Sequence, residues 1–259
     1  MNKNLSIVVI VKNGEHEISM TLQSIREQRL QNLELIIIDG KSTDGTIGVV
    51  QKFEDVVTCI VSEPDKGHYD AYNKGRELAT GDFILYLNCG DRFSDKNQVK
   101  KAVSQILYKD QLYFSRAIIR SGKVVFHYPP YRDLGSNWHK KNLPNMQTMF
   151  FPKMFYESHS FNLQLRLTAD DDFKLHAIKK LKVNFIDTDL IEFNRDGISS
   201  NHKSFKLLLE RIRESLMLNL EHSRYFRLFL DPLKRILMYL IHSIFGDEKF
   251  IKFIKFVKR

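Results

Sequence analysis

A chain of 259 residues with 43% apolar residues suits one large globular domain, or one domain with an appendage. Cys59 and Cys89 are its only cysteines, which excludes a disulfide framework and favours a reducing, cytosolic compartment. The net charge of +9 is uneven, because residues 201–259 hold thirteen Lys or Arg against six Asp or Glu. This asymmetry predicts an anionic partner for the C-terminal part, either membrane or nucleic acid.

The first ninety residues alternate between apolar runs and segments with apolar residues at helical spacing. Continuous apolar runs are typical of strands buried on both faces of a parallel sheet. The alternation therefore predicts a parallel α/β unit with right-handed crossovers. We expect strands at Leu5–Val11, Leu33–Ile38, Val56–Val61 and Phe83–Leu87, and helices at Glu15–Gln28, from Thr46, and at Ala71–Ala79. The seven-residue run before Lys12 is too short for a secretory signal peptide, so we expect none.

The middle of the chain predicts a second group of mixed elements. Ser121-Gly122 separates two strand-like runs, which is a hairpin signal. Phe173 and Ala177 share a face of a later helical segment. We expect a helix at Asp95–Tyr108, hairpin strands at Gln111–Ile119 and Lys123–Tyr128, a strand at Met146–Phe151, a helix at Thr168–Leu181 and a strand at Val183–Ile186.

The C-terminal segment has a helical period and a basic, Phe- and Leu-rich composition. Charged residues and Pro232 interrupt the apolar stretch Tyr225–Phe245, which argues against a transmembrane helix. The composition predicts a basic amphipathic tail that lies in a membrane interface. The alternative is that these helices pack on the α/β domain or on another protomer. No nucleic-acid-binding motif is present, so we expect no nucleic acid partner.

Acidic residues follow two of the predicted strands. Asp39 ends the second strand, and Asn88-Cys89-Gly90-Asp91 follows the fourth. Ligands of open α/β sheets bind outside the carboxyl ends of the strands, so chemistry is expected there. The alternative is that Asn88, Gly90 and Asp91 form only a turn, since these residue types dominate turns.

Two segments together resemble family 2 glycosyltransferases of the GT-A fold. They are Asp39–Thr46 (DGKSTDGT) and Ser62–Asp82 (SEPDKGHYDAYNKGRELATGD), which leads into an apolar strand and an acidic loop. The resemblance covers about the first hundred residues closely and thins out afterwards. It implies a GT-A fold, Rossmann-like with a mostly parallel sheet and flanking helices, over residues 1–200. Residues 201–259 would then form the helical basic tail.

The resemblance implies a nucleotide-sugar donor site along the strand ends. Asp39 would contact the nucleotide, whereas Asp44 is expected to act only as a helix cap. Asp70 and Lys74 are also spaced for a simple ion pair on a helix, and Cys89 is expected to pack. The donor-binding residues implied are Val11, Asn13, Asp39, Ser42, Asp65, Lys66, Asp70, Lys74, Asn88, Cys89 and Gly90.

Asp91 is the implied metal ligand. The departing diphosphate needs a divalent cation or a basic clamp, and Mn²⁺ or Mg²⁺ prefers carboxylate and phosphate oxygens. The loop commonly carries two acids in the family, but here it holds one, with Asn88 as a weak ligand or an orienting group.

The implied catalytic base lies in the acidic run Asp170-Asp171-Asp172 ahead of a predicted helix. Asp170 aligns with the family's base, with Asp172 in reserve, because a carboxylate can take the proton of an acceptor hydroxyl. Alternatively, three acids suit a helix's first turn, and Thr168 with Asp171 resembles a capping box. Gln147 and Arg195, the latter in a closing loop over residues 194–200, are expected near the acceptor.

The implied activity is inverting transfer of a sugar, most simply from a UDP-sugar, to a glycan or polyprenyl-diphosphate-linked acceptor. Relatives of this kind build surface polysaccharide of the O-antigen or capsule type at the cytoplasmic face of the inner membrane. An oligomer is possible. Two alternatives stay open: a sugar nucleotidyltransferase, and a non-catalytic, membrane-associated subunit that binds a nucleotide sugar.

Overall fold

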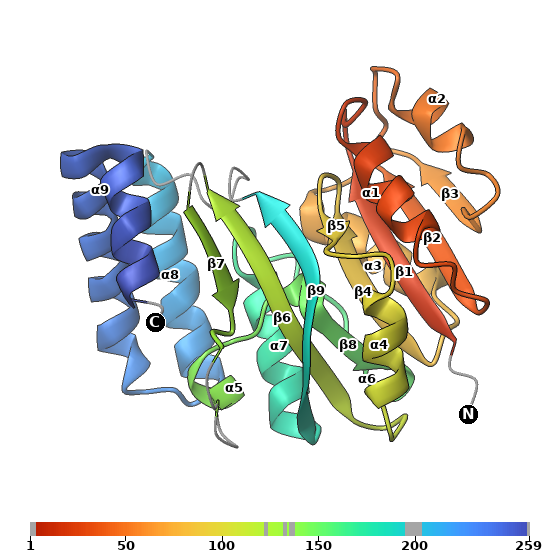
Figure 1. Cartoon of the computed structure of the whole chain (residues 1–259). Coiled ribbons are helices and arrows are strands. Elements are labelled where there is room, and N and C mark those ends of the chain that lie inside the picture. The colour runs from red at the N-terminus through yellow and green to blue at the C-terminus, as the bar shows by residue number, and fades with distance from the viewer. Residues whose placement is uncertain (1–3, 122–123, 132–133, 135–137, 195–203, 258–259) are drawn as a thin grey trace.

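The computed structural model describes residues 4–121, 124–131, 134, 138–194 and 204–257. They form one curled sheet with helices on both faces and a pair of long C-terminal helices at one end (Figure 1). The order along the sheet is β3-β2-β1-β4-β8-β6-β9-β5, with β7 paired to β6. The α/β class expected from the sequence is confirmed.

The first half of the sheet is parallel, as predicted. Alternate residues of β1 pack into two separate cores, with Ile7 and Val9 on one face and Val8 and Ile10 on the other. This two-sided burial explains why the strand reads as a continuous apolar run. The strands are β1 (Leu5–Val11), β2 (Leu33–Asp39), β3 (Cys59–Ser62) and β4 (Phe83–Asn88).

Helices cover both faces of this parallel half. Ile18, Leu22 and Ile25 are fully buried on α1. Gly75 of α3 lies so close to β1 that a Cβ there would be 2.3 Å from Val8 Cγ1, which sets the short helix–sheet distance. The helices are α1 (Ile18–Arg26), α2 (Thr46–Gln51), α3 (His68–Leu78) and α4 (Gln98–Gln105).

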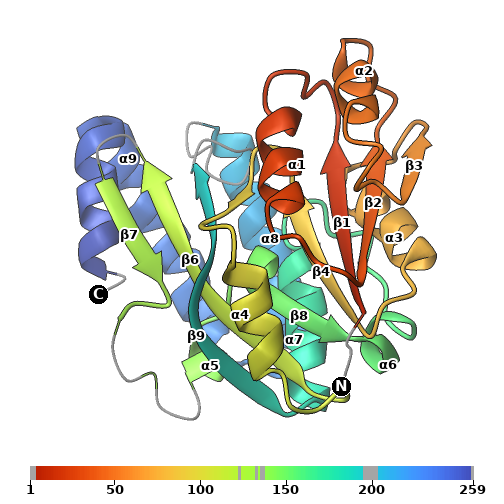
Figure 2. The same ribbon diagram turned by 45° about the vertical axis from the view of Figure 1, so that its right-hand side comes forward.

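The second half of the sheet is mixed in direction. The predicted hairpin is confirmed, with Ile119 of β6 opposite Phe126 of β7. Next to it, β6 runs parallel to β9 and antiparallel to β8, and β8 is antiparallel to β4 (Figure 2). The strands are β5 (Arg92–Phe93), β6 (Leu112–Ser121), β7 (Val124–Tyr128), β8 (Met149–Pro152) and β9 (Val183–Asn194).

Several predicted bounds were wrong. The strand expected from Val56 begins only at Cys59, because residues 56 and 57 still bond back to Phe53. The segment Met146–Thr148 forms a 3-10 turn, η1, before β8. The strand predicted to end at Ile186 continues to Asn194, because it pairs with β6 and with β5. The remaining helices of this half are α5 (Trp138–Lys141), α6 (Lys153–Tyr156) and α7 (Ala169–Lys180).

The tail forms two helices, α8 (Phe205–Glu221) and α9 (Arg227–Val257), which pack on each other. The inner face of α8 is buried, including Leu208, Glu214 and Leu218, and α9 also contacts β7. The alternative that the tail helices pack on the rest of the chain is therefore confirmed for the inner face of α8 and for part of α9. Within the part of the chain that the structure describes, no helix combines the length and apolar character needed to cross a membrane.

Candidate functional site

The carboxyl ends of β1, β2 and β4 meet at one edge of the sheet. Val11 pairs with Asp39, and Ile10 pairs with Asn88, so the predicted residues at the three strand ends are neighbours. Asp39 is fully buried and accepts hydrogen bonds from the hydroxyls of Ser42 and Ser62. It also accepts one from the Ser42 backbone N–H at 3.0 Å, so this carboxylate shapes the following loop.

The loops after β1 and β2 are bonded to each other. Asn13 adopts a left-handed conformation with φ 51°, its N–H donates to Ser42 Oγ at 2.7 Å, and its Oδ1 accepts from Thr43 N–H at 2.8 Å. The predicted N-cap at Asp44 was wrong by one residue, since α2 begins after Gly45. Asp44 nevertheless accepts from the Thr46 N–H at 3.1 Å and holds the turn.

The predicted acidic segment after β3 gathers around one lysine. Lys74 Nζ lies 2.9 Å from Glu63, 2.7 Å from Asp65 and 3.7 Å from Asp70. Although partial desolvation lowers it, the bonds to Asp65 and Glu63 raise the pKa of Lys74 above its usual range. The ion pair expected between Asp70 and Lys74 is therefore confirmed.

Asp65 and Lys66 are positioned by close contacts. A Cβ on Gly40 would lie 2.8 Å from Asp65 Oδ2, which brings this carboxylate against the loop after β2. Asp70 Oδ2 accepts from the Lys66 N–H at 2.9 Å. The acidic segment thus borders the same sheet edge as Asp39.

The β4 end forms a tight turn that holds Asp91. Asp91 is 6% exposed, and its Oδ2 accepts from the Asn88 N–H at 2.8 Å. Burial raises the pKa of Asp91 to about 7, against the opposing effect of that hydrogen bond. Gly90 has φ 95° and donates to Thr21 Oγ1 at 2.9 Å. Cys89 packs against Gly14, and burial raises the pKa of its thiol to about 12, which agrees with a packing role.

Tyr72 connects the β4 turn with Gln147. Its hydroxyl donates to Asn88 Oδ1 at 2.8 Å, and Gln147 lies against the same hydroxyl. Burial raises the pKa of Tyr72, and the charges of Asp91 and Asp170 act in the same direction. The fully buried Tyr72 side chain is therefore near both the predicted metal ligand and the predicted base.

Asp170, in the first turn of α7, is held by two side chains. Tyr69 Oη donates to its Oδ1 at 2.9 Å, and Lys174 Nζ lies 3.0 Å from its Oδ2. Burial raises the pKa of Asp170, but Lys174 and Tyr69 outweigh this effect and hold it below its ordinary value. Lys174 also lies 2.8 Å from Asp171. The Asp170 carboxylate is therefore ionised at neutral pH, as a base must be.

An aromatic cluster sets the distance between α3 and α7. The Phe161 ring stacks on Phe173 with 4.3 Å between centroids and on Tyr69 with 5.8 Å. Asn73 fixes Phe161 by accepting from its N–H at 2.8 Å and donating to its carbonyl at 3.0 Å. These contacts bring Asp170 beside α3, although one hundred residues separate Asp170 from Tyr69 and Asp70 along the chain.

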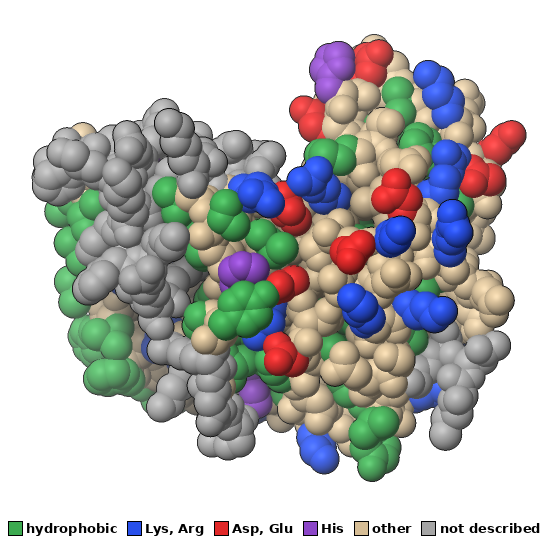
Figure 3. All heavy atoms as spheres, in the orientation of Figure 1, with side chains coloured by type: hydrophobic (Ala, Val, Ile, Leu, Met, Phe, Trp, Pro, Cys, Tyr) green, Lys and Arg blue, Asp and Glu red, His purple; other side chains and the backbone are tan. Residues whose placement is uncertain are grey.

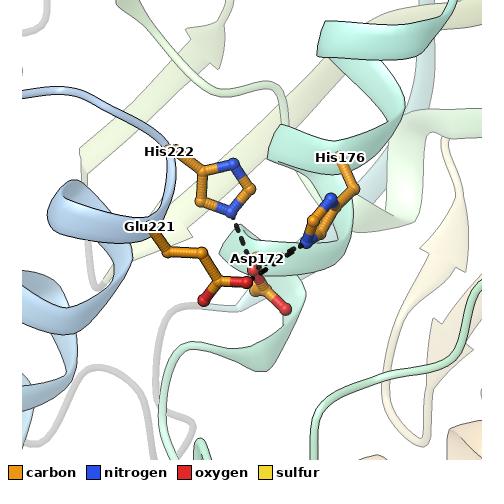
Figure 4. A group of neighbouring side chains, drawn as sticks. All are labelled: Asp172, His176, Glu221 and His222. Carbon is orange, nitrogen blue, oxygen red and sulfur yellow. Dashed lines mark hydrogen bonds and ion pairs between the residues drawn. The ribbon is translucent and has the colours of Figure 1, made fainter.

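Asp172 points to the opposite side of α7. It is 4% exposed, and its Oδ1 lies 2.8 Å from His222 Nε2 at the end of α8 and 3.5 Å from His176 Nε2 (Figure 4). The structure therefore separates the reserve base from Asp170 and joins it to the tail.

The capping box predicted for Thr168 and Asp171 was wrong. Thr168 is the N-cap residue of α7, but its side chain caps no N–H of that helix. Its hydroxyl donates instead to Glu214 of α8 at 2.8 Å. Glu214 also accepts from the backbone N–H groups of Arg166 at 2.8 Å and Leu167 at 3.0 Å, so a buried carboxylate of the tail organises this loop.

A cavity of about 400 Å³ lies between α7, α8 and α9. Its wall includes Asp171, the neighbour of Asp170, and several cationic side chains. Burial and Arg227 lower the pKa of Arg224, and burial and Arg235 lower the pKa of Arg211. The cationic residues of the wall are Arg211, Arg224, Arg227, Lys234 and Arg235.

Sequence reasoning missed Tyr69, Tyr72 and His68 of α3, and Glu214 of α8. Burial lowers the pKa of His68, although the nearby charges of Asp170 and Asp65 oppose this effect. The helix predicted at Ala71–Ala79 begins instead at His68, and its added first turn brings His68 and Tyr69 to the side of α3 that carries Tyr72. Glu214 gave no local signal, because its partners are more than forty residues away. Arg195 and the loop 195–200 lie outside the described residues.

Comparisons with known proteins agree on one family. The family described as "Glycosyl transferase family 2" matches residues 6–173. A "PGL/p-HBAD biosynthesis glycosyltransferase" of Mycobacterium bovis (strain BCG / Pasteur 1173P2) is 27% identical over 222 residues, 83% of this chain and 86% of that protein. The Escherichia coli "UDP-Glc:alpha-D-GlcNAc-diphosphoundecaprenol beta-1,3-glucosyltransferase WfgD" is 30% identical over 124 residues, 47% of this chain and 49% of WfgD.

Solved structures share the fold. S. aureus TarS 1–349 in complex with UDP-GlcNAc has a TM-score of 0.67 and 18% identity, and the match covers 93% of this chain and 73% of TarS 1–349. The mannosyltransferase PcManGT from Pyrobaculum calidifontis, in complex with GDP-Man and Mn²⁺, has a TM-score of 0.65 and 15% identity over 98% of this chain and 79% of PcManGT.

The family match covers most of the chain and includes the strand ends, the acidic segment and Asp170. The alternative that the chain is a nucleotidyltransferase is not supported, because these relatives are named glycosyltransferases. The chain is a glycosyltransferase of GT-A fold and belongs to glycosyl transferase family 2.

Proposed function

We propose that this glycosyltransferase moves a sugar, with inversion, from a UDP-sugar to an acceptor that is linked to a polyprenyl diphosphate. One observation carries this proposal: α3 joins the donor edge of the sheet to Asp170. Tyr72 bonds Asn88 at the end of β4, and Tyr69, one turn earlier, bonds Asp170. A sugar held above this helix would have the nucleotide on one side and a carboxylate base on the other.

The donor side of the proposal rests on the sheet edge. Asn13, Asp39 and Ser42 form a polar rim beside Val11, where a nucleoside would bind, as in other open α/β sheets. WfgD and the TarS complex are both named with a UDP-sugar, whereas PcManGT was solved with GDP-Man. UDP is therefore the preferred nucleotide, and GDP is the first competitor to test.

Asp91 is the proposed ligand for Mn²⁺ or Mg²⁺. Its Oδ2 accepts from the Asn88 N–H at 2.8 Å, and the Asn88 side chain also bonds this carboxylate, so Asn88 orients the proposed ligand. A hard carboxylate beside a diphosphate provides the oxygen ligands that these ions prefer. The ion would neutralise charge on the departing nucleoside diphosphate. PcManGT, which shares the fold, was solved with Mn²⁺.

Asp170 is the proposed base for the acceptor hydroxyl. Its side chain is 29% exposed, so an incoming hydroxyl can reach it. Lys174 and Tyr69 keep it ionised and fix its orientation, and general base catalysis contributes typically 10²–10⁴-fold. The acceptor oxygen would attack the anomeric carbon while Asp170 takes its proton and the nucleoside diphosphate leaves from the opposite face, which inverts the configuration. Asp172, the predicted reserve base, is 4% exposed and bonded to His222 on the opposite side of α7, so Asp170 is the base proposed here.

The cationic cavity supports a lipid-linked diphosphate as the acceptor's anchor. Five cationic side chains against Asp171 and Asp231 give its wall a positive balance. Arginine favours phosphate because its guanidinium donates in a planar fork. The cavity borders Asp171, next to the proposed base, and the name of WfgD includes an acceptor carried on diphosphoundecaprenol.

The outer faces of α8 and α9 support attachment to a membrane surface at the cytoplasmic side, where a polyprenyl acceptor would be embedded. Phe226 and Phe229 are 78% and 75% exposed, and hydrophobic side chains gather along this edge in Figure 3. Sedimentation with anionic vesicles tests the attachment. Phe229→Gln should weaken it, whereas Leu107→Gln, at an exposed site on the other half, should not. Equal binding by both variants would contradict it.

The decisive experiment for the function is a transfer assay with a panel of UDP- and GDP-sugars and a short-chain polyprenyl-diphosphate glycan. We expect product with one UDP-sugar, and NMR of the new linkage should show the inverted anomeric configuration. Release of pyrophosphate from a nucleoside triphosphate would favour a nucleotidyltransferase instead. Donor binding without turnover by any acceptor would favour the non-catalytic subunit.

A further inference from the structure

Four side chains outside the proposed donor site converge between helix α7 and the C-terminal end of helix α8. Asp172 and His176 lie four residues apart on one face of α7, and Glu221 and His222 are adjacent at the end of α8 (Figure 4). Each offers one ligand atom, and these four atoms all lie within 4.8 Å of one another. Among the described residues, this is the one group of three or more His, Cys, Asp and Glu side chains gathered so closely.

The spacing is close to that of a tetrahedral zinc site. His222 Nε2 lies 2.8 Å and His176 Nε2 3.5 Å from Asp172 Oδ1, and His176 Nε2 lies 3.7 Å from Glu221 Oε1. Ligands placed about 2.0–2.2 Å from a tetrahedral ion lie roughly 3.3–3.6 Å from one another. Small rotations of these side chains would therefore be enough to enclose an ion.

The chemistry of the donor set selects the ion. Two imidazole nitrogens suit Zn²⁺ and similar transition metals, whereas Mg²⁺ and Ca²⁺ prefer oxygen alone. Two carboxylates balance the charge of a divalent ion. Asp172 and the His222 side chain are buried, while His176 and Glu221 are 36% and 52% exposed at the side chain, which leaves a route for entry.

We propose that Asp172, His176, Glu221 and His222 bind Zn²⁺ and that the ion fastens the tail helix α8 to α7. The site is separate from the donor edge of the sheet, because Asp172 faces away from Asp170 and Tyr69. It would fix the helix whose first turn carries Asp170 against the helix that carries Glu214 and part of the cationic cavity. The metal here is structural, so the proposal does not depend on which sugar is transferred.

The rival explanation is an ion-pair network without a metal, in which Asp172 simply bonds His222 and His176. The two explanations differ in a measurable quantity, the affinity for Zn²⁺. We would prepare the full chain free of metal with a chelator and titrate Zn²⁺ by calorimetry, with Mg²⁺ and UDP present to occupy the donor side. Co²⁺ would then be titrated while the visible absorption of a tetrahedral complex is followed.

We expect one Zn²⁺ per chain, a higher unfolding temperature with Zn²⁺, and a tetrahedral Co²⁺ spectrum. His176→Gln and His222→Gln should each weaken Zn²⁺ binding by at least about tenfold, because each removes a direct ligand. Asp91→Asn and His16→Gln, which alter groups outside the cluster, should bind Zn²⁺ like the wild type. Circular dichroism without metal shows whether each variant is folded, and His176→Gln, at a half-exposed position, is the safer of the two.

The proposal is overturned if the metal-free chain binds no Zn²⁺ at micromolar concentrations. It is also overturned if folded His176→Gln and His222→Gln bind Zn²⁺ as tightly as the wild type, or if Asp91→Asn alone abolishes binding. Failure of sugar transfer with intact Zn²⁺ binding would contradict the proposed function and leave this site standing.

Discussion

The parallel half of the sheet and the α7–α8 region place their functional side chains in different ways. In the parallel half, Asp39 and Asn88 are neighbours because consecutive strands end at the same edge. In the α7–α8 region, Tyr69 orients Asp170 and His222 orients Asp172, and these two partners are 153 residues apart in the sequence. Backbone topology determines the first site, and side chains distant in the sequence determine the second.

The largest effect is expected from Asp170→Asn, which removes the proposed base and leaves the donor edge intact. We expect kcat to fall by about 10²–10⁴-fold, because general base catalysis contributes that much. Steady-state transfer kinetics measure the loss. Asp171→Asn is the matched control, since Asp171 shares the contact with Lys174, and it should lose less than about tenfold. Equal losses in both variants would mean that the charge near Lys174 matters, and not the base.

Glu214→Ala tests whether the tail organises the loop before α7. Glu214 is buried and accepts from Leu167 N–H and the Thr168 hydroxyl, so its removal leaves buried donors without partners. We expect the free energy of unfolding in urea to fall by about 2–4 kcal/mol. Glu210→Ala, whose contact with the exposed Arg166 is 3.8 Å long, should lose less than about 0.5 kcal/mol. A comparable loss of stability in Glu214→Ala and Glu210→Ala would mean that Glu214 has no specific role in organising the loop before α7.

Arg224→Gln tests the cationic cavity as an acceptor subsite. We expect the KM for a polyprenyl-diphosphate acceptor to rise by about tenfold, since one charge-assisted hydrogen bond is worth roughly 1.5–3 kcal/mol. Arg213→Gln is the control, because Arg213 is exposed and does not line the cavity. An acceptor analogue that lacks the diphosphate should react equally well with both variants. A rise in KM for that analogue as well would argue against a phosphate site.

The smallest effect concerns pH. The pKa of Asp170 lies below its ordinary value in the folded protein, so the pairing with Lys174 and Tyr69 stabilises the fold above the unfolded pKa near 3.8 and is lost as pH falls through the folded pKa. Asp170→Asn should therefore be less stable than the wild type by about 1–2 kcal/mol between pH 5 and 8, and the gap should close below about pH 4. Urea unfolding at several pH values measures it. A gap that changes between pH 6 and 8 would contradict this assignment.

The two regions also differ in how far the sequence predicts them. Leu5–Val11 and Phe83–Leu87 could be predicted because two-sided burial leaves continuous apolar runs, and the strand order then brings Asp39 and Asn88 together. The position of Asp170 in the first turn of a helix was also predictable from its acidic run and the apolar pattern behind it.

The remaining features depend on contacts that leave no local pattern. The continuation of β9 to Asn194 follows from pairing with β6, and the cap of α7 is replaced by Glu214 because α8 packs there. The amphipathic pattern of the tail described only the exposed surface of α8, since the buried face carries Glu214 and Asn219 as well as Leu208 and Leu218. Because buried polar residues such as Glu214 look like surface residues in the sequence, the contact of α8 with α7 could not be predicted.

The most direct test of the account is a calorimetric titration of UDP and GDP into the wild type and Asp91→Asn, with Mn²⁺ present and after its removal by a chelator. We predict that UDP binds the wild type with Mn²⁺ and raises its unfolding temperature, as a ligand of the folded state must. Binding should weaken at least about tenfold without Mn²⁺ or in Asp91→Asn, roughly 1.4 kcal/mol. If neither nucleotide binds the wild type with Mn²⁺, the donor site is not at this edge of the sheet, and the central claim fails.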